Sequence, residues 1–106
     1  MSRRINLQDK ISNGSIILSG RDKGEVLREK LNLDQLEQDD DEVIIIVPES
    51  IVSFNSSYFL GLFTPSIKKY KSREKFLEKY KFECDEYIDK DIEDGITEAL
   101  KKNNLI

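Results

Sequence analysis

The longest unbroken apolar run in the chain covers residues 43–47, Val-Ile-Ile-Ile-Val. All of these residues are β-branched, which favours a strand over a helix. The run has no polar alternation, so it predicts a central strand covered on both faces, as in a parallel or mixed sheet. Pro48 should end this strand because proline has no N–H group for the sheet ladder.

The N-terminal part predicts two short strands. Apolar residues alternate weakly between Ile5 and Ile11, and a second apolar stretch covers residues 16–18. Asn13 and Gly14, between the two stretches, form a typical hairpin turn signal. We therefore expect a hairpin here.

Helical spacing follows from Ser19. Ser19 and Asp22 form a variant of the capping box, so Ser19 is the expected N-cap of the first helix. We expect Asn32 to end the regular helix, with residues 33–36 adding a loose final turn. The apolar stripe of this helix contains Val26, Leu27 and Leu31.

A second helix is predicted for residues 56–70, with an apolar face formed by Tyr58, Phe59, Leu62, Phe63 and Ile67. Pro65 cannot donate a hydrogen bond to Gly61, so it should kink the helix or end it near Thr64. Gly61 is small enough to permit close packing against a neighbour.

The remaining residues predict a short helix after Ser72, a strand over residues 81–85 and a last helix over residues 89–102. The order strand, strand, helix, strand, helix, strand, helix is typical of an α/β fold. We expect one domain, residues 1–106, with a single small mixed sheet and three to four helices packed against it.

Charge limits the partners that we expect. The net charge is −4, so the chain as a whole is not attracted to nucleic acid or to anionic lipid. Residues 38–42 are acidic throughout except for Gln38, and they predict a solvated loop. Seven lysines and arginines between residues 68 and 81 are interpreted mainly as a solvated helix face, although a docking patch for an acidic partner is the alternative.

The composition argues against catalysis. The chain has no histidine, which removes the commonest general base and the usual triads. It also has no glycine-rich phosphate loop. Asp89, Asp91 and Glu93 lack the glycine and the final glutamate of a calcium loop. The single cysteine, Cys84, is interpreted as a small buried residue. We expect no enzyme activity, no cofactor and no metal.

Two adjacent serines lie where the second helix should begin. Asn55, Ser56 or Ser57 could cap this helix by accepting hydrogen bonds from its free N–H groups. A phosphate on one of the serines is the functional alternative, because it would place about two negative charges at the positive end of the helix.

This segment resembles a known family. Asn55-Ser56-Ser57, between a strand and an apolar helix, is similar to the switch region of STAS domains, the fold of bacterial anti-sigma factor antagonists. That switch typically reads Asp-Ser-Ser-Gly, and a kinase phosphorylates its second serine. Asn55 falls on the aspartate, Ser57 on the phosphorylated serine and Tyr58 on the glycine, so two of the four positions differ.

STAS-like domains of uncharacterised function resemble the chain more closely. Ser19-Gly20-Arg21, with one inserted residue, is similar to the Ser-Arg element that opens their first helix. Ser57-Tyr58 and Leu62-Phe63 are similar to their Ser-Phe and Leu-Phe steps, and the resemblance covers about residues 15–100.

The resemblance implies a STAS-like regulatory module that binds another protein, with a histidine-kinase-type ATPase as the expected partner class. In this reading Ser57 is the hydroxyl that is modified or read, and Arg21 contacts an acidic or phosphate group. The complete expected surface is Ser19, Arg21, Ser53, Asn55, Ser56 and Ser57.

Two other functions remain open from the sequence. The chain could be an inhibitor or accessory protein of a phage or mobile element, acting through Asp39, Asp40 and Asp41. It could also be a nucleotide- or small-ligand-binding domain that uses the start of the second helix. No signal peptide or membrane-spanning stretch is evident, so we expect a cytoplasmic protein without a membrane partner.

Overall fold

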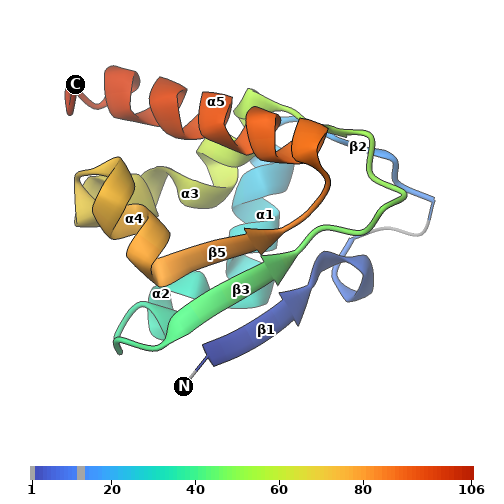
Figure 1. Ribbon diagram of the computed structural model, residues 1–106, viewed down its shortest axis with the longest axis horizontal. Coiled ribbons are helices and arrows are strands. Elements are labelled where there is room, and N and C mark those ends of the chain that lie inside the picture. The colour runs from blue at the N-terminus through green and yellow to red at the C-terminus, as the bar shows by residue number, and fades with distance from the viewer. Residues whose placement is uncertain (1, 12–13) are drawn as a thin grey trace.

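A computed structural model describes residues 2–11 and 14–106 of the chain. Helices and strands alternate along it, which confirms the expected α/β class (Figure 1). In chain order the elements are β1 (Ser2–Asn6), the 3-10 helix η1 (Leu7–Asp9), β2 (Ile17–Leu18), α1 (Arg21–Leu31), α2 (Leu33–Leu36), β3 (Glu42–Ile46), β4 (Ser53–Phe54), α3 (Ser56–Tyr70), α4 (Arg73–Lys79), β5 (Tyr80–Glu83) and α5 (Glu86–Lys102).

The strands form two parallel sheets in place of the single mixed sheet that we expected. One sheet has the order β1-β3-β5 and the other pairs β2 with β4. Paired strands are parallel because helices lie between them in the chain and bring it back in the same direction. The predicted N-terminal hairpin is wrong, since β1 and β2 belong to different sheets. Asn13, in its predicted turn, lies outside the described residues.

Strand β3 is central, as predicted, but only one of its faces is fully covered. Val43 and Ile45 are completely buried, whereas Ile44 and Ile46 are partly exposed. In Figure 1, α1 lies behind the sheet, and no helix of the described residues crosses its near face. The expectation of two covered faces was wrong because an apolar run shows that β-branched residues are present, not how many layers pack against them.

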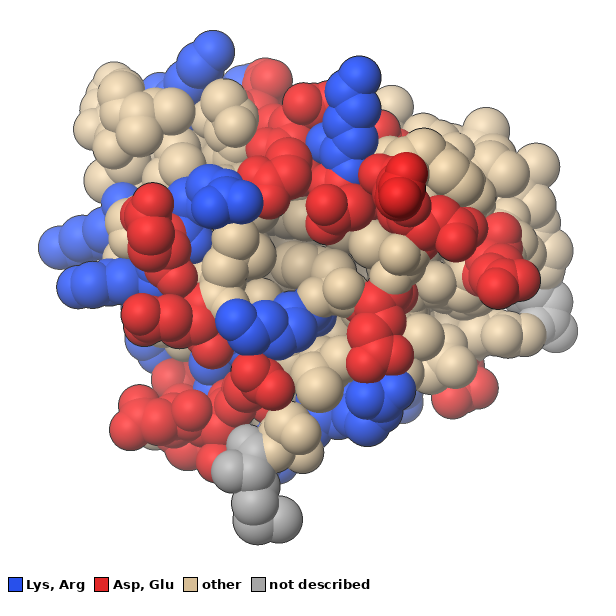
Figure 2. Space-filling model, viewed as in Figure 1, with Lys and Arg blue, Asp and Glu red and all other residues tan. Residues whose placement is uncertain are grey.

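Charged side chains lie over the open face of the sheet. Arg4 donates to both carboxylate oxygens of Glu83, at 2.8 and 2.9 Å, from one edge strand to the other. The strand register places this ion pair on the same face as Ile44 and Ile46. Figure 2, viewed from the same side, shows positive and negative side chains interspersed there.

Helices α1 and α3 cross in very close contact because each has a glycine at the crossing. A Cβ atom on Gly61 would lie 2.0 Å from the carbonyl oxygen of Arg21, and one on Gly24 would lie 2.2 Å from that of Tyr58. The prediction that Gly61 permits close packing is therefore confirmed. This crossing brings the N-termini of the two helices together.

Helix α3 does not end at Pro65 but continues to Tyr70. Pro65 removes the hydrogen bond to the Gly61 carbonyl, and Arg28 from α1 donates to the neighbouring carbonyl of Leu62 at 2.9 Å. Ile67 still accepts from Lys71 N–H at the end of the helix, so the last turn is intact.

Other element ends differ from the predictions. Ser19 does not cap α1; the cap is Gly20, whose φ of 95° suits glycine, and no side chain bonds to the first turn. Helix α5 begins at Glu86, three residues before the predicted start, and β5 begins at Tyr80 rather than at residue 81. Helix α4 follows Ser72, as predicted, and Ser72 caps it by accepting from Lys75 N–H at 3.2 Å.

The core lies between the helices and the covered sheet face. Its centre is an aromatic cluster in which neighbouring rings are 5.0–6.4 Å apart. Such edge and tilted pairs stabilise a core beyond simple burial. The cluster consists of Phe59, Phe63, Phe76, Tyr80 and Phe82.

Candidate functional site

The Ser57 hydroxyl joins the N-termini of α1 and α3. It accepts a hydrogen bond from Gly20 N–H at 3.1 Å and donates one to Asn55 Oδ1 at 3.2 Å. Asn55 Oδ1 also accepts from Ser57 N–H at 3.1 Å, so Asn55 is the cap of α3 among the three candidates. Ser57 is partly exposed. The sequence left Asn55, Ser56 and Ser57 open as caps of this helix, and it did not predict Gly20 as the partner of Ser57.

Ser56 and Ser53 lie on a different side of the same helix end. They line a shallow hollow of about 190 Å³ together with Asp91 and Asp94 of α5. Asp91 Oδ2 accepts a hydrogen bond from Phe54 N–H at 2.9 Å. The hollow is therefore acidic, and a phosphate or nucleotide bound there would face two carboxylates.

Arg21 is the first residue of α1, and Ser19 lies two residues before it. The two side chains have different neighbours. Arg21 is exposed, and its Nε lies 3.9 Å from a carboxylate oxygen of Glu25. Ser19 lines a cavity on the side of α1 that faces β2. The six expected residues thus do not line one site: Asn55 bonds to Ser57 and also lines the hollow with Ser53 and Ser56, whereas Arg21 and Ser19 have other neighbours.

A buried polar cluster behind α2 was not found from the sequence. Glu37 is 6% exposed and accepts hydrogen bonds from the hydroxyls of Ser66 and Tyr80. Arg28, 7% exposed, lies 3.5 Å from Glu37 and donates to Ser66 at 2.8 Å and to Asp34 at 2.7 Å. Burial, together with the Glu37 carboxylate, raises the pKa of Tyr80 above its ordinary value. Except for Arg28 Nε, which has no hydrogen-bond partner among the described residues, these groups satisfy one another, which fits a structural role.

The acidic loop is held by basic residues from other elements. Lys79 is 5% exposed and donates to the carbonyl oxygens of Asp39 and Asp41, at 2.9 and 2.6 Å. Arg3 donates to the Asp39 carboxylate at 2.9 Å. A hydrogen bond from Asp41 N–H is the main cause of a lowered Asp39 pKa. Residues 38–40 are exposed, as predicted for a solvated loop, but Lys79 is buried and does not belong to a solvated helix face.

The cysteine and the acidic residues of α5 that the sequence analysis considered have surroundings that fit structural roles. Desolvation raises the pKa of the half-buried Cys84 thiol to about 11, with Asp89 and Asp85 adding to the rise, so the thiol is protonated at neutral pH. Glu93 forms an ion pair with Arg73 at 2.6 Å. Among residues 2–11 and 14–106, no group of three or more acidic or cysteine side chains is arranged to hold a metal ion.

No helix formed by the described part of the chain is long and apolar enough to cross a membrane. No family model, curated protein or solved structure matches the chain. The STAS-like resemblance therefore remains a prediction from short motifs.

Proposed function

We propose that this chain is a non-enzymatic, cytoplasmic interaction module that binds another protein, and that phosphorylation of Ser57 switches the interaction. The partner class that the STAS-like resemblance suggests is a histidine-kinase-type ATPase. The observation that carries the proposal is the position of the Ser57 hydroxyl, between Gly20 N–H and Asn55 Oδ1 at the meeting point of two helix N-termini.

A phosphate on Ser57 would change this contact in a defined way. The modified oxygen would lose the proton that it now donates to Asn55. The added charge, about −1.5 to −2, would lie at the positive ends of α1 and α3. Arg21, exposed in the first turn of α1, is available to a phosphate or to an acidic partner group. The change would therefore alter the surface while the helices remain folded.

Ser57 is favoured over Ser56 on electrostatic grounds. Ser56 shares its hollow with Asp91 and Asp94, whose carboxylates would repel a phosphate. Ser57 instead contacts a backbone N–H donor from α1. The two adjacent serines therefore provide a matched test and control.

The test is capture of partners by the tagged chain from the cells that produce it. We would compare Ser57→Ala and Ser57→Asp with Ser56→Ala and Ser56→Asp. The proposal expects a stoichiometric partner whose capture differs between the two Ser57 variants and is unchanged by both Ser56 variants. Each Ser57 variant loses hydrogen bonds worth about 0.5–1.5 kcal/mol apiece, too little to unfold a typical domain. Equal capture by all variants would remove the switch.

A further inference from the structure

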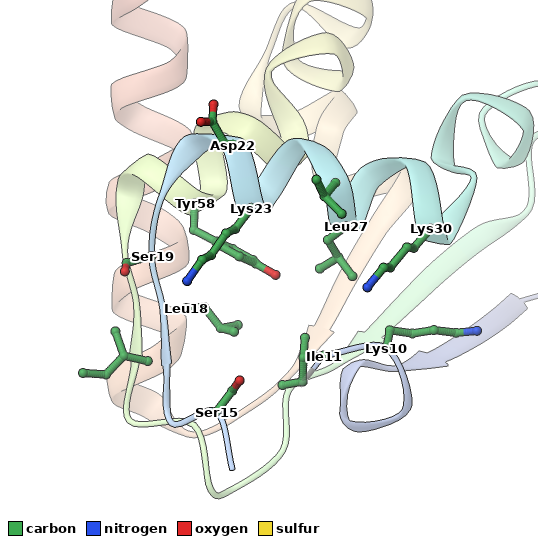
Figure 3. Close-up of a pocket in the computed structure, with 12 residues that line it drawn as sticks. Lys10, Ile11, Ser15, Leu18, Ser19, Asp22, Lys23, Leu27, Lys30 and Tyr58 are labelled. Carbon is green, nitrogen blue, oxygen red and sulfur yellow. The ribbon is translucent and has the colours of Figure 1, made fainter. Parts of the chain in front are cut away.

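A cavity of about 320 Å³ lies between α1, β2 and the segment that follows η1 (Figure 3). Its volume is within the range of small-molecule sites, about 300–1,000 Å³. Ser57 does not line it, so an inference about this cavity does not depend on the proposed switch. The apolar residues that line it are Ile11, Ile17, Leu18, Val26 and Leu27.

The hydroxyl of Tyr58 points into this cavity (Figure 3). Tyr58 is 4% exposed, and its ring packs edge-on against the ring of Phe54, with the ring centroids 5.5 Å apart. Within residues 2–11 and 14–106, the hydroxyl has no hydrogen-bond partner. The hydroxyl is not one of the fully buried unpaired atoms of the described residues, so it opens to the cavity, where a bound ligand could accept its hydrogen bond. Desolvation raises the pKa of Tyr58 to about 12, so the group is a hydrogen-bond donor at neutral pH.

Three lysines also line the cavity, against one acidic residue. The lysines are Lys10, Lys23 and Lys30, and the acid is Asp22. In Figure 3, Lys23 and Lys30 extend from α1 on the side of the Tyr58 hydroxyl. Among the described residues, no carboxylate forms an ion pair with any of the three lysines. This concentration of positive charge is local, because the whole chain has a net charge of −4.

We propose that the cavity binds a small organic carboxylate with a short apolar tail. The carboxylate would pair with Lys23 and Lys30 and accept a hydrogen bond from Tyr58, and the tail would lie against Leu18 and Leu27. One anionic end and one apolar end match what the cavity offers: ammonium and hydroxyl donors beside an aliphatic wall.

The test is a titration of the full chain with sodium octanoate at low salt, followed by NMR and calorimetry. The neutral control ligand is 1-octanol, which has the same tail without the charge. The proposal expects saturable one-site binding of octanoate, with shifted signals from Leu18, Leu27 and Tyr58, and much weaker binding of 1-octanol. Because the charge is recognised, affinity should also fall as salt is added.

Variants separate the recognition groups from the fold. Tyr58→Phe removes only the hydroxyl and should weaken octanoate binding by about three- to tenfold, the usual effect of one lost hydrogen bond. The double variant Lys23→Gln, Lys30→Gln should weaken it by at least about tenfold. The control Lys90→Gln, Lys101→Gln, at exposed positions of α5, removes two charges away from the cavity and should leave the affinity unchanged.

The proposal is overturned if octanoate does not saturate a single site, or if 1-octanol binds equally well. Unchanged affinity in folded Tyr58→Phe and in the folded double lysine variant would also overturn it. Equal losses of affinity in the Lys90, Lys101 control and in the Lys23, Lys30 variant would show that only overall charge matters, which contradicts a built site.

Discussion

Replacing Gly61 by alanine should strongly destabilise the protein, although alanine is the better helix former. The new Cβ atom would lie 2.0 Å from the Arg21 carbonyl oxygen and 2.9 Å from Glu25 N. Carbon and oxygen atoms normally stay about 3.5 Å apart, so α1 and α3 would have to separate by more than roughly 1 Å. Both neighbouring atoms belong to the backbone and cannot move aside by a rotamer change.

The magnitude follows from two opposing effects. Overpacking typically costs about 1–3 kcal/mol, and the rigid backbone contact places this site at or above the upper end. Alanine recovers about 1 kcal/mol through its helix propensity. We expect a net loss of at least about 2 kcal/mol in the free energy of unfolding. With an m-value of about 2 kcal/mol/M, the urea midpoint should fall by about 1 M.

Urea denaturation followed by circular dichroism measures this effect. Lys68→Ala, at an exposed position of the same helix, is the control and should change stability by less than about 0.5 kcal/mol. Hydrogen exchange at Gly20 should also speed up in Gly61→Ala, because the separated helices would lose the Gly20–Ser57 hydrogen bond. A Gly61→Ala protein as stable as the wild type would refute the close crossing.

Three further predictions concern other parts of the fold. Glu37→Ala leaves buried Arg28 without its buried carboxylate and should lower the unfolding free energy by about 3–5 kcal/mol in thermal or urea denaturation; a loss below about 1 kcal/mol would contradict the cluster. Asn55→Ala removes the cap of α3 and should cost about 1 kcal/mol in the same assay, whereas Asn55→Asp should retain most of it. The Cys84 thiol, with a pKa of about 11, should react with iodoacetamide more slowly at pH 8 than in the urea-unfolded chain, and its rate should rise as the pH approaches 11; equal rates at pH 8 would exclude the shift.

The elements that the sequence predicted well are those set by local patterns. The β-branched run formed the central strand, and Asn55 and Ser72 capped their helices because capping depends on residues only two or three positions away. Pattern also identified Gly61 as a position of close packing. These features need no knowledge of which elements meet in space.

The features that the sequence did not predict depend on distant residues. The division into two sheets follows from strand pairing across long separations, such as Ile5 with Ile45. The prediction that Ser19 caps α1 was wrong because the chain turns at Gly20, which has a positive φ and takes the cap position. The Gly20 contact of Ser57 requires the α1–α3 crossing, and the orientation of Tyr58 into a cavity cannot be seen from its place in an apolar helical stripe.

The most direct test of the central claim is mass spectrometry of the chain purified from the cells that produce it, with fragment masses that locate any modification. The account predicts a phosphate on Ser57 in a fraction of the molecules, none on Ser56, and loss of the modified fraction in Ser57→Ala. A chain that binds its partner while Ser57 remains unmodified under every growth condition tested would contradict the phosphorylation switch.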